Sequence, residues 1–536
     1  MSVNKCIINY FKNHKIILLS TLLVIILSTL IVLIPPQILR LIVDNYIPSK
    51  LIDKILMISI MYTISYIAIY LVSYLEKVLL IIISNGLSKD IRINMMLKIN
   101  KMSYKTLSLK DSSYLEASIT NDVDEINSLI VDGVISLFID LIKIIGILVS
   151  IYVYSIYFGL IITLVLPIII LFTLIIKKRM FKSQKNNKQE EANVNKLVSE
   201  NLDNIKTIKS ARIYNKVIDK YNNVLNNYYK TSTISSNYDS FYSPVINILK
   251  YSMIVLLIIL STQFNNIFAL STGVVVSTID LIISLFSPIE TLGMSIQTIQ
   301  KSLASISRIN DFFKLEEDNK SNLVTNIDLS KIEIKYENVS FGYNSNNLVI
   351  NNFNYTLSNN DKLTLIGRSG SGKSTLFRLT YGLVKPTNGR VLINNVDSYN
   401  LSDNIKSKIF SIVYQDLFFT GGTIKEELTL LDNSIKDSDI YNCLKWVGLS
   451  RIKDINLIFK EVDYSTGELQ LFNIARAILT NSKIILLDEF NSKIDLINAN
   501  NIINIINNVC KDKIVLSISH YGKLLNNSNI LNLETL

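Results

Sequence analysis

The sequence predicts two folds in one chain: an α-helical membrane domain with six spans and long helical loops, followed by an α/β domain with a phosphate-binding loop. Three observations predict this. Long uncharged stretches fill the first half, and short β-rich runs alternate with helical runs from Ile332 onward. The segment GRSGSGKST stands between a strand pattern and a helix pattern.

The composition is that of a membrane protein. Of 536 residues, 49% are hydrophobic and 18% are charged, against about 25% charged in an average soluble protein. The net charge of +10 is expected if Lys and Arg gather in cytoplasmic loops. The six spans exclude a nucleic-acid-directed protein. The cysteines Cys6, Cys443 and Cys510 lie far apart and predict free thiols in a reducing compartment.

Uncharged runs of about 20 residues are long enough to cross a bilayer. Ile16–Ile34 and Ile55–Leu75 each fit one span, whereas Ile144–Ile176 and Tyr251–Ile279 are long enough for two spans joined by a turn. The expected spans are about 16–34, 55–75, 134–154, 160–176, 246–263 and 273–290.

Loop charges orient these spans. Residues 177–243 carry thirteen Lys and Arg, whereas the predicted outer loops carry only Lys50 and Lys54. The positive-inside rule therefore places both termini in the cytoplasm, and we expect a multi-pass protein of a bacterial cytoplasmic membrane. Residues 76–133 and 177–243 are polar and helical in pattern, so these long cytoplasmic loops are expected to be helical hairpins.

Several charges lie where a bilayer penalises them. Asp140 and Lys143 are three residues apart and are expected either to pair within one helix or to lie at a depth beyond the lipid headgroups. Asp280 lies in the run VVVSTIDLIISLF without a basic residue within one turn. It is a candidate for lining a polar substrate pathway, although the spacing leaves that assignment open.

The second half contains a phosphate-binding pattern. Residues 319–331 are expected to form a linker, and residues 332–536 a nucleotide-binding domain. The strand pattern KLTLI leads into GRSGSGKST and then a helix pattern, which is the context of a phosphate-binding loop. The predicted ATP-contacting residues of this loop are Gly367, Arg368, Ser369, Gly370, Ser371, Gly372, Lys373, Ser374 and Thr375. We expect Lys373 to hold phosphates and the Ser374 hydroxyl to ligate Mg²⁺.

A second strand pattern, KIILLDEF, ends in two acids. We expect Asp488 to hold the Mg²⁺ shell and Glu489 to polarise the attacking water as a general base. Together with the phosphate-binding loop, this strand predicts an α/β P-loop ATPase domain.

With these motifs in order, the second half resembles the nucleotide-binding domain of ATP-binding cassette (ABC) transporters, and the whole chain resembles a half-transporter of the exporter type. The resemblance implies that Tyr343 stacks on adenine and that Gln415 links Mg²⁺ to the membrane part. It implies that Asn491–Asp495 form a dimer-contact loop and that His520 contacts the γ-phosphate.

The segment Tyr464–Glu468, YSTGE, aligns with the family signature LSGGQ when IARA (474–477) is matched. The resemblance implies that Ser465 and Gly467 grip the ATP held by the opposite subunit. Thr466 departs from the pattern, since a β-branched residue replaces a flexible glycine. The alternative is a helix that is merely capped.

One clamp segment and one phosphate loop cannot close a site on a single domain, so we expect a dimer with a second half-transporter. The resemblance implies ATP- and Mg²⁺-dependent export of a peptide, lipid-like or drug-like amphipath. The sequence does not identify the individual transported substrate. Three alternatives stay open: the weaker subunit of a heterodimer, an importer of iron-chelate complexes, and an ATP-sensing membrane regulator without transport.

Overall fold

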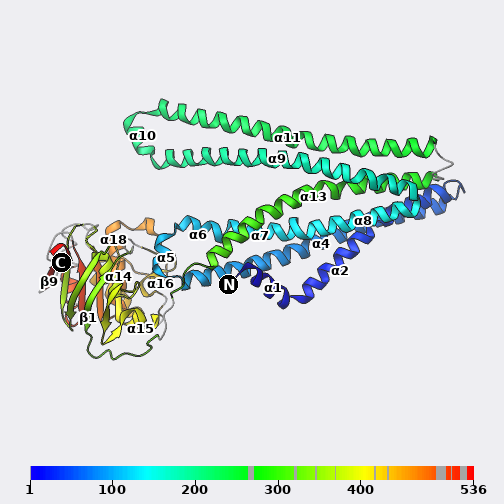
Figure 1. The fold of residues 1–536 in the computed structure, drawn as a ribbon. Helices are drawn as coiled ribbons and strands as arrows, with labels where there is room; N and C mark the ends of the chain where they lie inside the picture. The colour runs from blue at the N-terminus through cyan, green and yellow to red at the C-terminus, as the bar shows by residue number, and fades with distance from the viewer. Residues whose placement is uncertain are drawn as a thin grey trace. The chain divides into compact units, whose positions relative to one another are not determined.

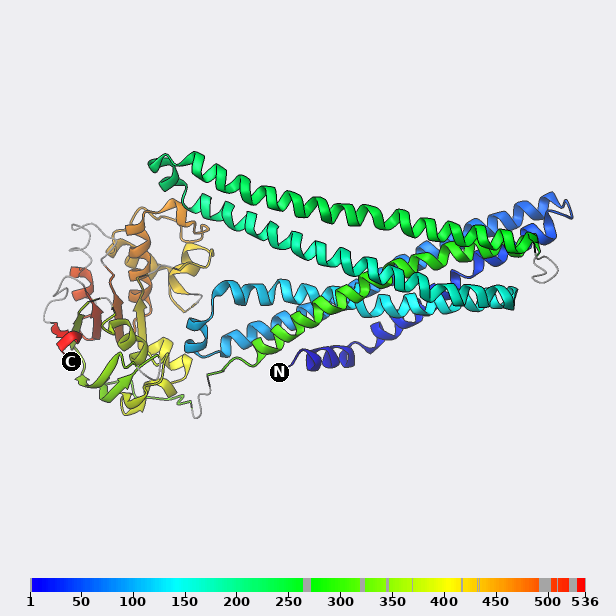
Figure 2. The same ribbon diagram turned by 45° about the horizontal axis from the view of Figure 1, so that its top comes forward.

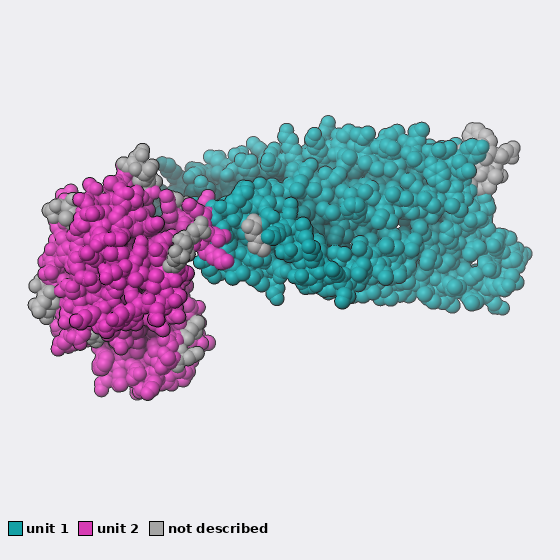
Figure 3. Space-filling view, turned by 60° about the horizontal axis from the view of Figure 1, so that its bottom comes forward, with its two compact units in different colours: residues 1–100, 111–315 teal, residues 101–110, 316–536 magenta. Residues whose placement is uncertain are grey.

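A computed structural model of the chain describes residues 2–263, 271–318, 323–343, 347–368, 370–415, 418–430, 432, 434–490, 503–508, 510–519 and 528–535. The chain divides into two compact units (Figure 3). Unit 1 comprises residues 1–100 and 111–315, and unit 2 comprises residues 101–110 and 316–536. Each unit has its own hydrophobic core.

The regular elements of unit 1 are helices throughout the part that the structure describes (Figure 1). They are α1 (Val3–Asn13), α2 (Lys15–Ile31), α3 (Ile34–Leu41), the π-helix η1 (Ile42–Tyr46), α4 (Ile52–Lys101), α6 (Ser112–Ile119), α7 (Asn121–Ser128), the π-helix η2 (Leu129–Ile135), α8 (Ser136–Tyr154), α9 (Ile156–Asp203), α10 (Ile205–Ala211), α11 (Tyr214–Gln263) and α13 (Thr272–Phe313).

Six helical stretches of the described residues are long and apolar enough to cross a membrane. They are Lys15–Tyr46, Ile52–Lys101, Ser112–Tyr154, Ile156–Asp203, Tyr214–Gln263 and Thr272–Phe313. A helix of 50 residues such as α4 rises about 75 Å, more than twice the hydrocarbon thickness of about 30 Å. The predicted six-span helical unit with long helical extensions is therefore confirmed.

The helix α13 forms the centre of unit 1. It packs against α7, α8, α9 and α11, and 56% of its most apolar window is buried, whereas none of the corresponding window of α4 is. Figures 1 and 2 show α9 and α11 side by side, joined through α10. Of α13 and α4, α4 is therefore the helix whose most apolar segment is less covered by the rest of unit 1.

Unit 2 contains two sheets in the described residues. The strands are β1 (Ile334–Phe341), β2 (Ile350–Leu357), β3 (Lys362–Ile366), β4 (Asn388–Ile393), β5 (Val396–Asp397), β6 (Phe410–Val413), β7 (Ile484–Asp488), β8 (Ile514–Ile518) and β9 (Asn529–Asn532). One sheet is antiparallel, in the order β2-β1-β4-β5, and the other is parallel, in the order β6-β7-β8-β3-β9.

The parallel sheet brings two distant motifs to one edge. In that sheet β8 lies between β7 and β3, and all three run in the same direction. The carboxyl ends of parallel strands meet at the same edge, which is where ligands bind in such folds. The loop after β3 and Asp488 at the end of β7 therefore lie at one edge, as the predicted α/β domain requires.

The remaining elements of unit 2 surround the sheets. They are α5 (Tyr104–Leu109), α14 (Lys373–Thr380), η3 (Ser398–Asn400), α15 (Asp403–Ile409), α16 (Ile424–Thr429), α17 (Asp437–Trp446), η4 (Glu461–Asp463), α18 (Thr466–Leu479) and η5 (Leu533–Thr535). The three cysteines are free, as expected, and the structure shows that they are also buried. Burial raises the pKa of Cys443 to about 12 and that of Cys510 to about 11.

Candidate functional site

The loop between β3 and α14 has the backbone of a phosphate cradle. Gly367, Gly370 and Gly372 have φ values of 144°, 90° and 93°, which residues with a Cβ rarely adopt. A Cβ on Gly367 would approach the Ser371 hydroxyl oxygen to 2.7 Å. Ser369 lies outside the described residues.

The charged and polar groups of this loop fit an anion. The Lys373 ammonium donates to the carbonyl oxygens of Gly367 at 2.6 Å and Arg368 at 2.8 Å, and only 6% of the residue is exposed. The Ser371 hydroxyl is buried without a hydrogen-bond partner among the described residues. A buried cation, an unpartnered hydroxyl and a helix amino terminus together suit a phosphate group.

The three predicted Mg²⁺ ligands line one cavity of about 340 Å³: Ser374, Gln415 and Asp488. In the described residues no group of three or more His, Cys, Asp or Glu gathers around a possible metal position. A single carboxylate with neutral oxygen donors suits Mg²⁺, which usually binds proteins through one or two carboxylates together with phosphate oxygens. The donor set therefore fits Mg²⁺ bound with a nucleotide.

Glu489 begins the loop after β7 with an unusual backbone. Its φ is 44°, a conformation that costs free energy for a residue with a side chain and that recurs at functional sites. The Gln415 amide donates to its carboxylate at 2.9 Å. A predicted Mg²⁺ ligand, Gln415, is therefore in direct contact with the predicted general base. Asn491–Asp495 and His520 lie outside the described residues.

Tyr343 is held by contacts that the motif does not predict. Arg378 of α14 donates to the Tyr343 hydroxyl at 2.6 Å, and the Thr375 hydroxyl lies 3.3 Å away. Phe341 packs edge-on against its ring at a centroid distance of 5.0 Å. The sequence analysis missed Arg378, although its place five residues after Lys373 on one short helix is a local signal.

A second missed residue, Tyr104, is the first residue of α5. Residues 101–110 belong to unit 2, and Tyr104 lines the same cavity as Ser374 and Asp488. The Arg378 guanidinium lies 5.3 Å from the centroid of its ring. No local pattern marks Tyr104, because its partners follow more than 250 residues later in the chain.

The YSTGE segment forms a capping box at the start of α18. Ser465 is the N-cap, and its hydroxyl oxygen accepts from the Glu468 backbone N–H at 3.3 Å. The Glu468 carboxylate accepts from the Ser465 N–H at 2.9 Å and from its hydroxyl at 3.1 Å. This is the reciprocal pattern of the S-x-x-E motif.

Glu468 is also paired with a cation. Arg451 lies 2.8 Å from its carboxylate. The backbone N–H of Ser465 above all, and Arg451 to a lesser extent, hold the pKa of Glu468 below its usual range. A negative charge therefore stays at the amino terminus of α18 at neutral pH.

Thr466 and Gly467 are the first two residues of α18. Neither has a positive φ. The conformational freedom that glycine supplies is thus not used here, and the β-branched Thr466 fits the backbone without strain.

The far end of α18 is fixed by a buried ion pair. Arg476 bonds the carboxylate of Glu427 in α16 at 2.6 Å, and the Glu427 side chain is fully buried. Burial acts to raise the pKa of Glu427, but hydrogen bonds from Thr420 and Gly422 and the Arg476 charge bring it below its usual range. This pair fixes α18 against α16, and the sequence analysis did not identify it.

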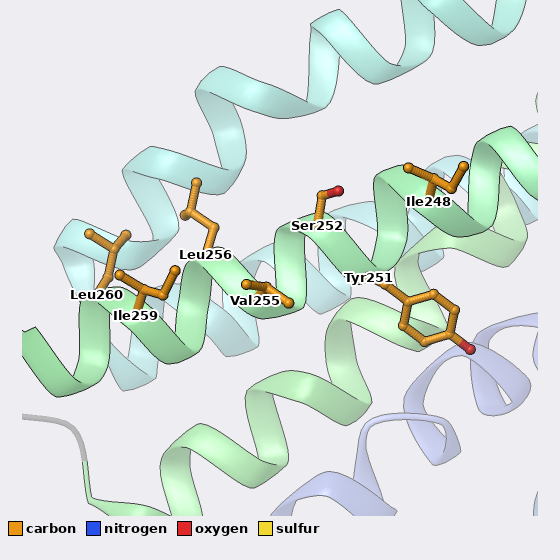
Figure 4. Close-up of a pocket in the computed structure, with 7 residues that line it drawn as sticks. All are labelled: Ile248, Tyr251, Ser252, Val255, Leu256, Ile259 and Leu260. Atoms are coloured by element: carbon orange, nitrogen blue, oxygen red, sulfur yellow. The ribbon is translucent and has the colours of Figure 1, made fainter.

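Unit 1 offers a hollow of about 680 Å³ along α11 (Figure 4). Its lining is mostly aliphatic and carries no charge: Ile248, Tyr251, Ser252, Val255, Leu256, Ile259 and Leu260. Asp280, the predicted pathway residue, lies elsewhere in unit 1, on α13, and accepts a hydrogen bond from Tyr66 of α4 at 3.4 Å.

Two family models match the sequence. The model described as the ABC transporter transmembrane region matches residues 17–289, more than half of the chain, and the model described as ABC transporter matches residues 350–492. A solved structure of a bacterial Atm1-family ABC exporter with ATP bound has a TM-score of 0.75 at 18% identity, covering 97% of this chain and 93% of that chain. At this identity the likeness shows the fold.

Curated relatives are similar at lower coverage. The putative ABC transporter ATP-binding protein MG015 homolog of Mycoplasma pneumoniae is 30% identical over 240 residues, 44% of this chain and 38% of that protein. The microcin-J25 export ATP-binding/permease protein McjD of Escherichia coli is 26% identical over 343 residues, 61% of this chain and 58% of that protein. The matched region thus spans less than two thirds of either relative.

Proposed function

Because the chain belongs to the ABC transporter family and has the exporter architecture, we propose that it is one half of a dimeric transporter that uses ATP to export an amphipathic substrate. The transmembrane domain comprises residues 1–318, the linker residues 319–331 and the nucleotide-binding domain residues 332–536. The protein spans a bacterial cytoplasmic membrane with both termini in the cytoplasm, in keeping with the Lys and Arg of residues 177–243.

One observation carries the proposal: Ser374, Gln415 and Asp488 line a single cavity, on the same chain as six membrane helices. These three residues ligate Mg²⁺, which supplies positive charge to the phosphates when bound. Lys373 and the loop from Gly367 to Thr375 hold the phosphates of ATP.

The chain's own residues carry out hydrolysis. Glu489 takes a proton from the attacking water, and the Gln415 amide orients the Glu489 carboxylate through the 2.9 Å hydrogen bond. Tyr343, whose ring Arg378 and Phe341 hold, stacks on adenine. His520 contacts the γ-phosphate.

The site is completed by a second subunit. Ser465 and Gly467 lie at the amino terminus of α18 and face the ATP of the partner. Since the chain carries one copy of each element, two copies or two related chains form two ATP sites. When the two nucleotide-binding domains close around ATP, they favour one of two conformations of the membrane domains, which thereby switch between inward- and outward-facing states.

The substrate is a peptide, lipid-like or drug-like amphipath. A relative named for microcin-J25 export supports a peptide, and the uncharged hollow along α11 offers contact for an apolar portion. A second candidate is the weaker subunit of a heterodimer, and one observation favours it. The N–H and the hydroxyl of Ser465 both donate to the Glu468 carboxylate, so these two donors are already engaged before ATP binds.

ATP hydrolysis by the purified chain in lipid tests the proposal. In the Glu489→Gln variant we expect hydrolysis to fall by at least about 10²-fold, because the general base is lost, while ATP binding is retained. Glu461→Gln, a change at an exposed glutamate of unit 2, is the matched control and is expected to hydrolyse ATP normally.

Wild-type activity in the Glu489→Gln variant would refute the assigned base. A folded, dimeric wild-type protein without ATP hydrolysis would refute the homodimer and favour the heterodimer, whose partner subunit would then restore activity on mixing.

A further inference from the structure

Asp280 is a carboxylate inside an apolar helix of unit 1, and the part of the chain that the structure describes pairs no cation with it. It is the ninth residue of α13 and is half-buried. Among the described residues, no Lys or Arg forms an ion pair with it, and its hydrogen-bond partner is the Tyr66 hydroxyl. Because an isolated charge at this depth is costly, such residues usually face a cavity or a ligand.

Two other charged side chains of the spans, Asp140 and Lys177, differ from Asp280 in their neighbours. Asp140 accepts from the Thr291 hydroxyl at 2.5 Å and has Lys143 three residues away. The Lys177 ammonium lies 4.0 Å from the centroid of the Tyr242 ring. Asp280 has a neutral hydroxyl as its hydrogen-bond partner and no oppositely charged residue within one turn of its own helix.

Arg40, a cation close to the start of α13, is already paired. The backbone N–H of Gly273 in α13 donates a hydrogen bond to the Asp44 carboxylate at 2.7 Å, and the Arg40 guanidinium lies 3.8 Å from the same carboxylate. Asp280 follows Gly273 by seven residues, which is about 10 Å of helix rise. Arg40 is therefore neutralised by Asp44 and leaves the charge of Asp280 uncompensated.

Two tyrosines complete the group. Tyr62 and Tyr66 are one turn apart on α4, their ring centroids are 5.1 Å apart, and the planes meet at 70°. The Tyr62 hydroxyl donates to that of Tyr66 at 3.4 Å, and Tyr66 donates to Asp280. Both rings are half-buried, so they present aromatic surface beside an unpaired carboxylate.

We propose that Asp280, Tyr66 and Tyr62 form a binding site for the positively charged group of the transported substrate, which is therefore a cationic amphipath. The carboxylate supplies the counter-charge, and the aromatic rings attract a cation through their π-faces. The inference rests on the proposed export function, and it adds the sign of the substrate's charge.

The test measures binding to the full chain in nanodiscs of phosphatidylcholine, a lipid without net charge, so that the membrane does not itself concentrate cations. The probes are a dansyl-labelled long-chain alkylamine and the uncharged alcohol of the same length. In Asp280→Asn we expect about ten- to a hundredfold weaker amine binding, because a desolvated charge pair is lost. Alcohol binding is expected to stay the same.

Three further variants sharpen the result. Asp280→Glu keeps the charge and is expected to retain amine binding. Tyr66→Phe keeps the ring and loses one hydroxyl, so amine binding should weaken only about two- to tenfold. Asp140→Asn is the matched control, because it removes a membrane carboxylate that already has partners, and amine binding should be unchanged.

Equal amine binding by the wild type and Asp280→Asn would overturn the site, as would an equal loss in Asp140→Asn. The binding assay contains no ATP, so its outcome is independent of hydrolysis. ATP hydrolysis by the same samples, abolished in Glu489→Gln, reports on the proposed function separately. The retained alcohol binding of Asp280→Asn shows that the variant is folded.

Discussion

Two helices of unit 2 begin at segments that the family resemblance assigns to phosphate binding, and their amino termini differ. α14 begins after Gly372, without a side-chain cap, beside the buried Lys373 ammonium. α18 begins after Ser465 with a complete capping box closed by Glu468. Among the described residues, the first end has a buried ammonium and no side-chain cap, whereas the second carries a carboxylate of its own.

The difference teaches how the same local physics gives different affinities for an anion. A helix amino terminus attracts phosphate through backbone N–H groups without partners and through the helix dipole. At α18 the Glu468 carboxylate already accepts from Ser465. ATP must therefore displace or share these contacts, so α18 should bind phosphate more weakly than α14 until Glu468 moves.

The largest effect is expected at α14. Lys373→Ala should reduce ATP hydrolysis by about 10²–10³-fold, as removal of one preorganised charge-stabilising donor does. The measurement is steady-state hydrolysis together with nucleotide binding. Lys385→Ala removes an exposed lysine of the same unit and is expected to leave both unchanged. Comparable losses in the two variants would show that general basicity, not the loop, holds the nucleotide.

The next effect is expected at the cap of α18. Ser465→Ala should lower the free energy of unfolding by about 1 kcal/mol and hydrolysis by roughly tenfold, because a hydrogen bond to a charged phosphate is lost. Thr423→Ala is the matched control, since Thr423 and Glu426 form the same capping box on α16. It should cost similar stability without the loss of hydrolysis. If both variants lose hydrolysis equally, α18 is a capped helix and no clamp.

A smaller gain is expected from Glu468→Gln. The amide keeps an oxygen for the cap and removes the negative charge, so the ATP concentration for half-maximal hydrolysis should fall about two- to fivefold, in line with charge effects at helix ends. Loss of the exposed contact with Arg451 should change stability by less than about 1 kcal/mol. Glu426→Gln in α16 serves as the control, and an unchanged ATP dependence in Glu468→Gln would contradict the comparison.

The smallest effect on hydrolysis is expected from Thr466→Gly. The backbone at Thr466 is helical without a positive φ, so glycine adds no needed freedom and should change hydrolysis by less than about twofold. Stability should fall by about 0.5–1 kcal/mol, because glycine loses more entropy in a helix. A severalfold gain in hydrolysis would restore the view that Thr466 weakens the clamp through its backbone.

The sequence by itself determined the features that depend on neighbours along the chain. The six apolar helices, the strand–loop–helix order around Lys373 and the acids at the end of β7 all follow from local patterns of hydrophobicity and glycine. The S-x-x-E spacing of Ser465 and Glu468 is likewise sufficient to predict the capping box that begins α18. Hydrogen bonds over a few residues and the period of apolar side chains are sufficient to encode them.

Only the tertiary structure decided which distant side chains meet. Gln415 and Glu489 are 74 residues apart, and Tyr66 and Asp280 are 214 apart. Their contacts depend on strand order and on how long helices pack, and many pairings of equally apolar helix faces satisfy one hydrophobic pattern. For that reason the sequence identified Asp280 as a candidate but not the two tyrosines beside it. It also did not predict that Tyr104 lines the same cavity as Asp488.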